Sequence, residues 1–170
     1  MRDSANKPDR WLALTGAMVV LVIALWYSLR YSGNVVDDAL ISFVYAKSIA
    51  LGNGAVFSHG ERVEGYTNFL WVVALAPLYR VSLWAGADFV RMAVIASALL
   101  AALDVVLVFA IGRQLWGSKK GAFAASLAAI GLCVADNSYC VWAMLAMENH
   151  LVAFWVLLAL YLRGREPRHL

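Results

Sequence analysis

The chain has little charge, few cysteines and no basic stripe. Of its 170 residues 15% are charged and two are cysteines, Cys133 and Cys140, whereas 63% are hydrophobic. Soluble domains are about 45–50% apolar, so an ordinary soluble fold is excluded. Two cysteines make no disulfide framework, although a single pair stays open. The net charge of +3 comes from short basic clusters at the ends of apolar runs, which gives no nucleic-acid-binding surface.

Long apolar runs predict an all-α integral membrane protein with about four transmembrane helices. A span needs about 20 apolar residues, and runs that approach or exceed this length lie at 11–29, 89–112, 121–135 and 147–162. Trp11 at one end of the first run and Trp26 at the other suit the two membrane interfaces. A signal peptide is the alternative for this run, but its length and the lack of a small-residue cleavage site favour a retained span.

The distribution of Lys and Arg predicts the orientation. We expect the protein to lie in the inner (cytoplasmic) membrane, with both ends of the chain in the cytoplasm. In this orientation nine of the 14 basic residues lie on the cytoplasmic side. Four of the other five, Arg30, Lys47, Arg62 and Arg80, are spread over the long outer loop, residues 30–88, and Arg91 lies at the outer start of the next apolar run. If the apolar run Thr67 to Leu83 crossed the membrane, Arg113, Lys119 and Lys120 would fall outside and the bias would be lost. We therefore expect Thr67 to Leu83, interrupted by Pro77, to be a short re-entrant or surface helix.

The outer loop has a second predicted surface helix, from Asp38 to Leu51. Apolar side chains cover most of it and leave a narrow polar face with Ser42 and Tyr45. Gly52-Asn53-Gly54 ends it, because these residues tolerate the positive φ of a helix exit. Val56 to Tyr66 has no helical period and is predicted to be a loop.

Asp37 and Asp38 are the first candidate catalytic residues. Aspartate is favoured at a helix N-terminus for structural reasons alone. Two adjacent carboxylates at a membrane face also suit a general base for a hydroxyl, or a site that helps hold a divalent cation. Both interpretations are open at this point.

A second polar cluster lies in the string HGERVEGYTN. Glu61, Arg62 and Glu64 form either a solvated loop or a rim that contacts sugar hydroxyls and phosphate, with Arg62 suited to phosphate. His59 and Glu61 are two metal-type ligands without a clear third, which is a weak signal.

Two further carboxylates stand near or inside predicted spans. Asp104 falls near the middle of 89–112, where a charge is costly. It is a functional group, a protonated carboxyl, or a hydrogen-bonded contact between helices, and we favour the contact. Glu148 opens the last span together with His150, as a helix-start carboxylate or as part of the same cavity as the aspartates.

The stretch DDALISFVYAKSIALGNGAVFSHGERVEGYTNFLW, from Asp37 to Trp71, resembles the GT-C class of membrane glycosyltransferases. The similarity is closest to arabinofuranosyltransferase- and mannosyltransferase-like members of bacterial envelopes. The string GERVEGYTNFLW is specific, whereas AMENHLVAFWVLLALYL, from Ala146 to Leu162, is a looser match. The order of elements fits over roughly Asp9 to Arg165.

The resemblance implies an inverting sugar transfer from a polyprenyl-phosphate donor to a glycan or lipid acceptor at the outer membrane face. It implies that Asp37, or else Asp38, is the base that deprotonates the acceptor. The substrate pocket would include Glu61, Arg62, Glu64, Tyr66, Asn68 and Glu148. Some relatives bind a divalent cation near such carboxylates.

Length is the departure from the family, whose members have more spans. Residues 1–170 are therefore expected to be a single, incomplete GT-C module, in contact with membrane lipid and completed by further sequence or by a second membrane chain. A non-catalytic accessory subunit or inactive remnant is the main alternative. A small transporter using Asp104 is the third.

Overall fold

The fold was examined in a computed structural model of the chain. It describes residues 37–58, 65–116 and 137–165, together with isolated helical positions within 11–26 and at Gly131. The predicted spans 11–29 and 121–135 fall largely outside the described residues. So do His59, Glu61, Arg62 and Glu64.

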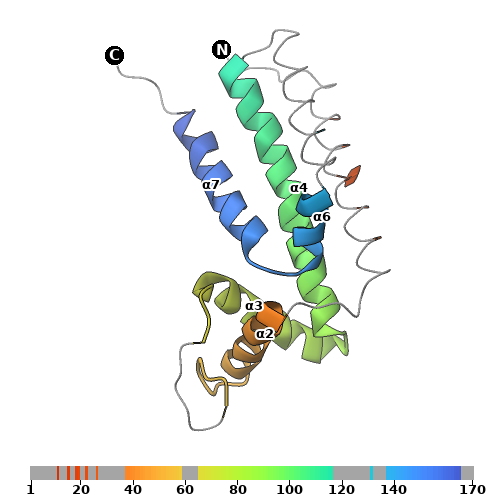
Figure 1. The fold of residues 1–170 in the computed structure, drawn as a ribbon, viewed down its shortest axis with the longest axis vertical. Helices are drawn as coiled ribbons and strands as arrows, with labels where there is room; N and C mark the ends of the chain where they lie inside the picture. Colours follow the sequence, from red (N-terminus) through yellow and green to blue (C-terminus); the bar gives the residue numbers. More distant parts are fainter. Residues whose placement is uncertain are drawn as a thin grey trace.

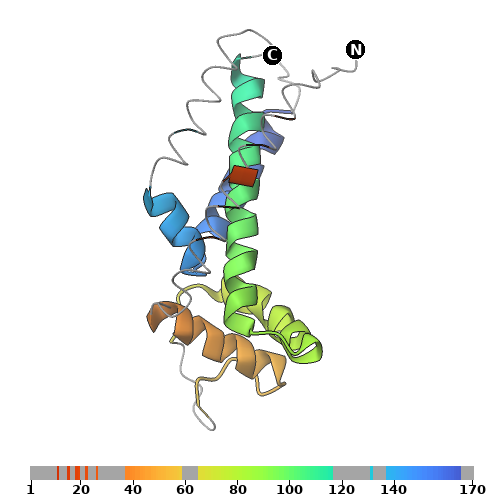
Figure 2. The ribbon, with the colours of Figure 1, turned by 90° about the vertical axis from the view of Figure 1, so that its right-hand side faces the viewer.

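The described part is all-helical and contains no β-strand. Its helices are α2 (Asp37–Ala50), α3 (Phe69–Ala85), α4 (Phe89–Trp116), α6 (Asn137–Met144) and α7 (Asn149–Arg163). Helix α4 forms the long axis, with α6 and α7 beside it (Figure 1). Helices α2 and α3 lie across the N-terminal end of α4 (Figure 2). The described part thus consists of a bundle, formed by α4, α6 and α7, and a transverse layer, formed by α2 and α3.

Helix α4 is the one described helix long and apolar enough to cross a membrane, over Phe89–Leu115. Its 28 residues rise about 42 Å, more than the ~30 Å of a hydrocarbon core. The apolar helices α3 and α7 are shorter, with 17 and 15 residues. The described residues therefore support one of the four predicted spans by length and composition.

Helix α7 runs parallel to α4. Asp104 of α4 contacts His150 at the start of α7, and ten residues later Gln114 Nε2 donates to the backbone oxygen of Tyr161, 3.2 Å away. The buried side of α4 is rich in small residues, which allows helices to approach closely. Those with less than a tenth of their surface exposed are Ala93, Ser97, Ala98, Ala101 and Ala102.

The transverse layer shares one apolar core with the N-terminal half of α4. The core contains Ala39, Phe43 and Ala46 of α2, Trp71 and Leu75 of α3, Ala93 and Val94 of α4, and Ala146 of the α6–α7 connection. Ala46 and Ala93 are fully buried, so helix surfaces meet there without a gap filled by water. This core fixes the layer against the bundle.

The helix boundaries differ from the sequence-based ones in small ways. Helix α2 begins one residue earlier than predicted and ends before Gly52, whose φ of +85° supplies the left-handed turn. Helix α3 continues through Pro77, which lies on its exposed side. Helix α6 was not predicted. It has only 8 residues, and its apolar residues do not recur with helical spacing, so the sequence gives little indication of a helix there.

Candidate functional site

Three stretches that stood out in the sequence meet at the junction between the transverse layer and the bundle. They are the first half of α2, the segment Gly65–Trp71 leading into α3, and the segment Ala146–His150 leading into α7. Side-chain hydrogen bonds join each stretch to another, across sequence separations of 26 to 80 residues. The tertiary fold therefore assembles the polar residues that lie far apart in the chain.

Asn68 is the centre of this junction. Its Nδ2 donates to Glu148 Oε2 at 2.7 Å and lies 2.9 Å from Ser42 Oγ. Ser42 Oγ in turn lies 3.3 Å from the backbone oxygen of Asp38. An amide has two N–H donors and a hydroxyl can accept one and donate one. The arrangement therefore links α2, the start of α3 and the start of α7 in one hydrogen-bonded series.

Trp71 fixes the neighbouring backbone. Its indole Nε1 donates to the backbone oxygen of Ala146 at 2.9 Å, and both residues are buried. Ala146 has a φ of +51°, which is rare for a residue with a side chain. Such strain persists where the surroundings over-determine the conformation. Here the indole and the apolar core hold the turn that presents Glu148, two residues later.

Glu148 stands at the N-terminal boundary of α7 but does not cap it. Its φ and ψ are helical, −70° and −10°, and its side chain makes no capping hydrogen bond. The half-buried carboxylate is turned to Asn68 instead. A carboxylate held by one amide keeps most of its acceptor capacity, since two oxygens offer about four lone-pair positions. Glu148 is thus available to bind hydroxyl groups.

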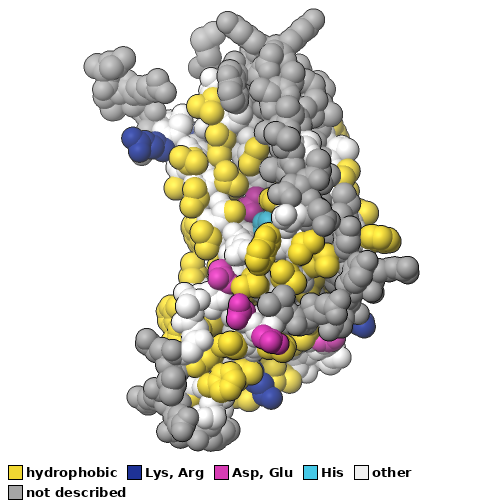
Figure 3. Space-filling view, viewed as in Figure 1, with side chains coloured by type: hydrophobic (Ala, Val, Ile, Leu, Met, Phe, Trp, Pro, Cys, Tyr) yellow, Lys and Arg dark blue, Asp and Glu magenta, His cyan; other side chains and the backbone are white. Residues whose placement is uncertain are grey.

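Asp37 and Asp38 occupy the first turn of α2, and both are exposed. Asp38 and Ser42 are four residues apart and share a face of the helix, so Asp38 lies on the side that meets Asn68. Figure 3 shows acidic side chains spaced along one face, from the α4–α7 pair down to the transverse layer. Described acidic residues are Asp37, Asp38, Asp88, Asp104 and Glu148. Of these, Asp104 is buried and Asp88 is paired with Arg91 at 3.5 Å, so Asp37, Asp38 and Glu148 are the carboxylates suited to bind hydroxyl-rich or cationic groups.

Tyr66 lies beside this junction in an aromatic cluster. Its ring is 4.7 Å from that of Tyr45 in an edge-to-face arrangement and 5.9 Å from that of Phe69 in a stacked one. The hydroxyl of buried Tyr45 accepts a hydrogen bond from Gly65 N at 2.9 Å. A Cβ on Gly65 would meet this hydroxyl at 2.9 Å, so glycine allows the close approach. The cluster fixes the segment that carries Asn68.

The resemblance allows a divalent cation near the carboxylates, but the described residues provide no complete set of metal ligands. Within 37–58, 65–116 and 137–165, no three His, Cys, Asp or Glu side chains come together as metal ligands do. Glu61, Arg62 and Glu64, expected at the pocket rim, lie outside these ranges.

Comparison with known proteins gives one similarity. No protein-family model matches the chain, and no solved structure matches it. Over 115 residues, the chain is 32% identical to the terminal β-(1→2)-arabinofuranosyltransferase of Mycobacterium tuberculosis (strain ATCC 25618 / H37Rv). The match covers 65% of this chain and 17% of that enzyme. The chain thus resembles part of a glycosyltransferase, in line with the resemblance found in its sequence.

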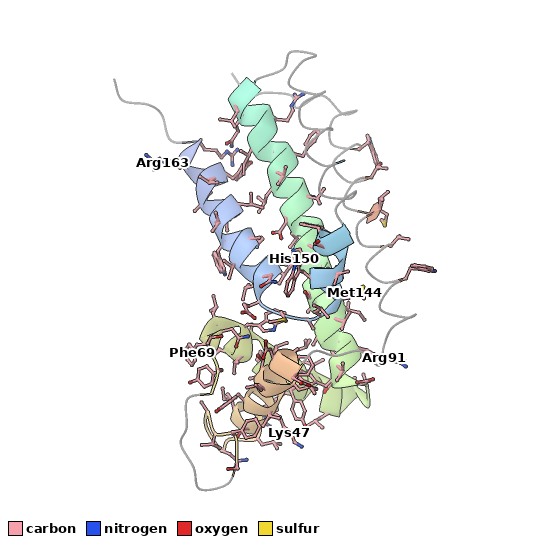
Figure 4. All side chains as sticks on the ribbon, viewed as in Figure 1. Lys47, Phe69, Arg91, Met144, His150 and Arg163 are labelled. Atoms are coloured by element: carbon pink, nitrogen blue, oxygen red, sulfur yellow. The ribbon has the colours of Figure 1, made fainter. Side chains whose placement is uncertain are left out.

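The structure also brings forward residues that the sequence did not single out for this site. Ser42 and Tyr45 were noted only as a polar helix face, and Trp71 only as the last residue of the string GERVEGYTNFLW. Their roles depend on partners at Asn68, Gly65 and Ala146, which no local pattern reveals. The ring of His150 is directed into the bundle between α4 and α6 (Figure 4).

Proposed function

We propose that the chain is the N-terminal part of a GT-C-type glycosyltransferase. It would act at the outer face of the cytoplasmic membrane, with both ends of the chain in the cytoplasm. The donor would be a polyprenyl-phosphate sugar and the acceptor an envelope glycan or lipid. The observation that carries this proposal is the contact between the two resembling strings, GYTNFLW and AMENH, through Asn68 and Glu148 at 2.7 Å.

In the proposed reaction, Asp37 is the general base and Asp38 the second choice for this role. The acceptor oxygen bonds to the anomeric carbon while its proton passes to the Asp37 carboxylate. The bond from that carbon to the phosphate oxygen breaks, and its electron pair leaves with the polyprenyl phosphate. Asp37 suits this role because its carboxylate is exposed in the first turn of α2 and is therefore open to the acceptor hydroxyl.

The remaining site residues would bind substrate. Glu148 and Asn68 would hold sugar hydroxyls, and Tyr66 would contribute an apolar ring face beside them. Glu61, Arg62 and Glu64 would form the rim, with Arg62 paired to the donor phosphate.

Sugar transfer in membranes from cells that express the chain from its own locus tests the proposal. With a polyprenyl-phosphate sugar as donor, D37N combined with D38N is expected to lower transfer by about 10²–10⁴-fold, the usual contribution of a general base. D88N is the matched control, because Asp88 is also exposed at a helix start and bonds to Val90 N at 2.9 Å. Equal transfer by the native chain and the double variant would refute the proposal.

A non-catalytic accessory subunit is the second candidate. Along α7, Val152, Trp155, Val156 and Leu160 are each more than half exposed and share one face. A second membrane chain or lipid would cover such a face. A stable complex with a larger glycosyltransferase, together with transfer that is unaffected by D37N and D38N, would favour this candidate over the first.

A further inference from the structure

A second buried polar group lies next to the candidate site. Asp104 Oδ2 of α4 is 3.0 Å from His150 Nδ1 of α7, and His150 Nε2 is 3.2 Å from the backbone oxygen of Tyr139 in α6. The side chains of Asp104 and His150 are 2% and 4% exposed. The hydroxyl of Tyr139 also donates to the backbone oxygen of Ala101, 2.7 Å away. Helices α4, α6 and α7 are thus joined at one point.

The geometry fixes how many hydrogens the pair holds. A carbonyl oxygen only accepts, so the contact with Tyr139 requires a hydrogen on His150 Nε2. The contact between Nδ1 and Asp104 Oδ2 requires a second hydrogen, on one atom or the other. An imidazolium with a carboxylate meets both conditions, and so does a neutral imidazole with a carboxylic acid. Either form is neutral overall, as a buried site favours.

The pair stands at the start of the helix that carries Glu148. His150 lies in the first turn of α7, two residues after Glu148, while Trp71 and Asn68 hold Ala146 and Glu148 from the other side. A helix end held on only one side would fray, because its first backbone groups have no partners within the helix. The hydrogen bonds of His150 are directional. They therefore set how closely the first turn of α7 approaches α4 and α6, and how that turn is rotated about the axis of α7.

We propose that Asp104 and His150 are positioning residues that fix the first turn of α7 and thereby hold the Glu148 carboxylate against Asn68. The importance of that carboxylate rests on the function proposed above. The position of the first turn of α7 does not depend on that function, and cross-linking measures this position without any sugar transfer.

The experiment uses the full chain in membranes, with Cys133→Ala and Cys140→Ser as the background. Asn68→Cys with Glu148→Cys reports the near end of α7, and Gln114→Cys with Gly164→Cys reports its far end, where Gln114 lies close to Gly164. A short bifunctional thiol reagent links each pair, and the linked fraction is read from protection against a maleimide mass tag.

D104L is expected to lower near-end linking by about tenfold while far-end linking stays unchanged, because the substitution leaves His150 buried without its partner. D104N is expected to stay within about twofold of the parent, since its amide can donate to Nδ1 while Nε2–H still donates to Tyr139. S97A is the matched control: Ser97 lies two turns away on α4, is fully buried, and has no hydrogen-bond partner among the described residues. It is expected to change neither link.

Unchanged near-end linking in D104L would overturn the proposal, and so would an equal loss in D104N. If D104L loses both links, the chain has unfolded and D104L with H150L decides, because this double variant removes the carboxylate and the imidazole together and leaves neither buried without its partner. Loss of only the near-end link in this double variant supports the proposal, and retention overturns it. Where transfer is measurable, D104L should lower kcat and D104N should restore it.

Discussion

The strained turn at Ala146 predicts that Ala146→Gly leaves the free energy of unfolding nearly unchanged. Ala146 is 1% exposed and has a φ of +51°, a conformation that costs an L-residue about 1–2 kcal/mol. Ala146→Gly removes this strain. It also loses a buried methyl group worth about 0.8 kcal/mol and adds about 0.4–1 kcal/mol of unfolded-chain freedom. These effects nearly cancel, so the free energy of unfolding should change by less than about 1 kcal/mol.

Ala143 is the matched control, since it is also fully buried but lies within helix α6. Ala143→Gly loses the same methyl group and about 1 kcal/mol of helix propensity, so it should destabilise by about 2 kcal/mol. One kcal/mol shifts the unfolding midpoint by about 2–4 °C in a chain of this size. In detergent, Ala143→Gly should lower the midpoint by about 4–8 °C and Ala146→Gly by no more than about 3 °C. Equal losses would show that Ala146 is not strained.

Three further predictions concern the contacts around the junction. Trp71→Phe leaves a buried carbonyl of the α6–α7 connection unpaired and should destabilise by about 1–3 kcal/mol in the same thermal assay; an unchanged midpoint would contradict this. Gly65→Ala should lower the midpoint, but much less when Tyr45→Phe removes the hydroxyl that the new Cβ meets at 2.9 Å; additive effects in the double-mutant cycle would exclude that clash. Asn68→Leu removes the donor to Glu148 and should lower sugar transfer by about tenfold or more, with protein level as the control; full transfer would argue against a role for this contact.

The fold could be predicted from the sequence where the signal is local. Helix α2 was predicted to within one residue at each end, because an acidic start and a Gly-Asn-Gly exit mark it. The span in α4 was predicted from its apolar length, which needs no tertiary partner. Helix α7 was also predicted closely, at 147–162 against Asn149–Arg163. Length and capping carried this information.

The site could be predicted only in part, because its contacts are not local. Asn68 and Glu148 were named from a resemblance, but nothing in either string indicates that the two side chains touch. Glu148 had two open interpretations; its side chain accepts a hydrogen bond from Asn68 and makes no capping hydrogen bond, and its role in a substrate pocket stays a prediction. Asp104 was expected to contact another helix, but its partner at His150, 46 residues away, had been assigned to the outer surface. Residues 59–64, which carry part of the expected rim, stay a prediction.

The contact between Asn68 and Glu148 also bears on how the chain is made. The two residues are 80 positions apart, and chains are synthesised at about 5–20 residues per second. Synthesis of the chain from Asn68 to Glu148 therefore takes on the order of 4–16 seconds. Until then, α2 and α3 lack their contacts with Ala146 and Glu148. During that interval Asn68 already has Ser42 of α2 as a partner, whereas its second N–H and the indole of Trp71 depend on water, lipid headgroups or the insertion machinery for hydrogen bonds. Ribosome stalling just before and just after α7 should therefore yield transverse layers that differ sharply in resistance to protease.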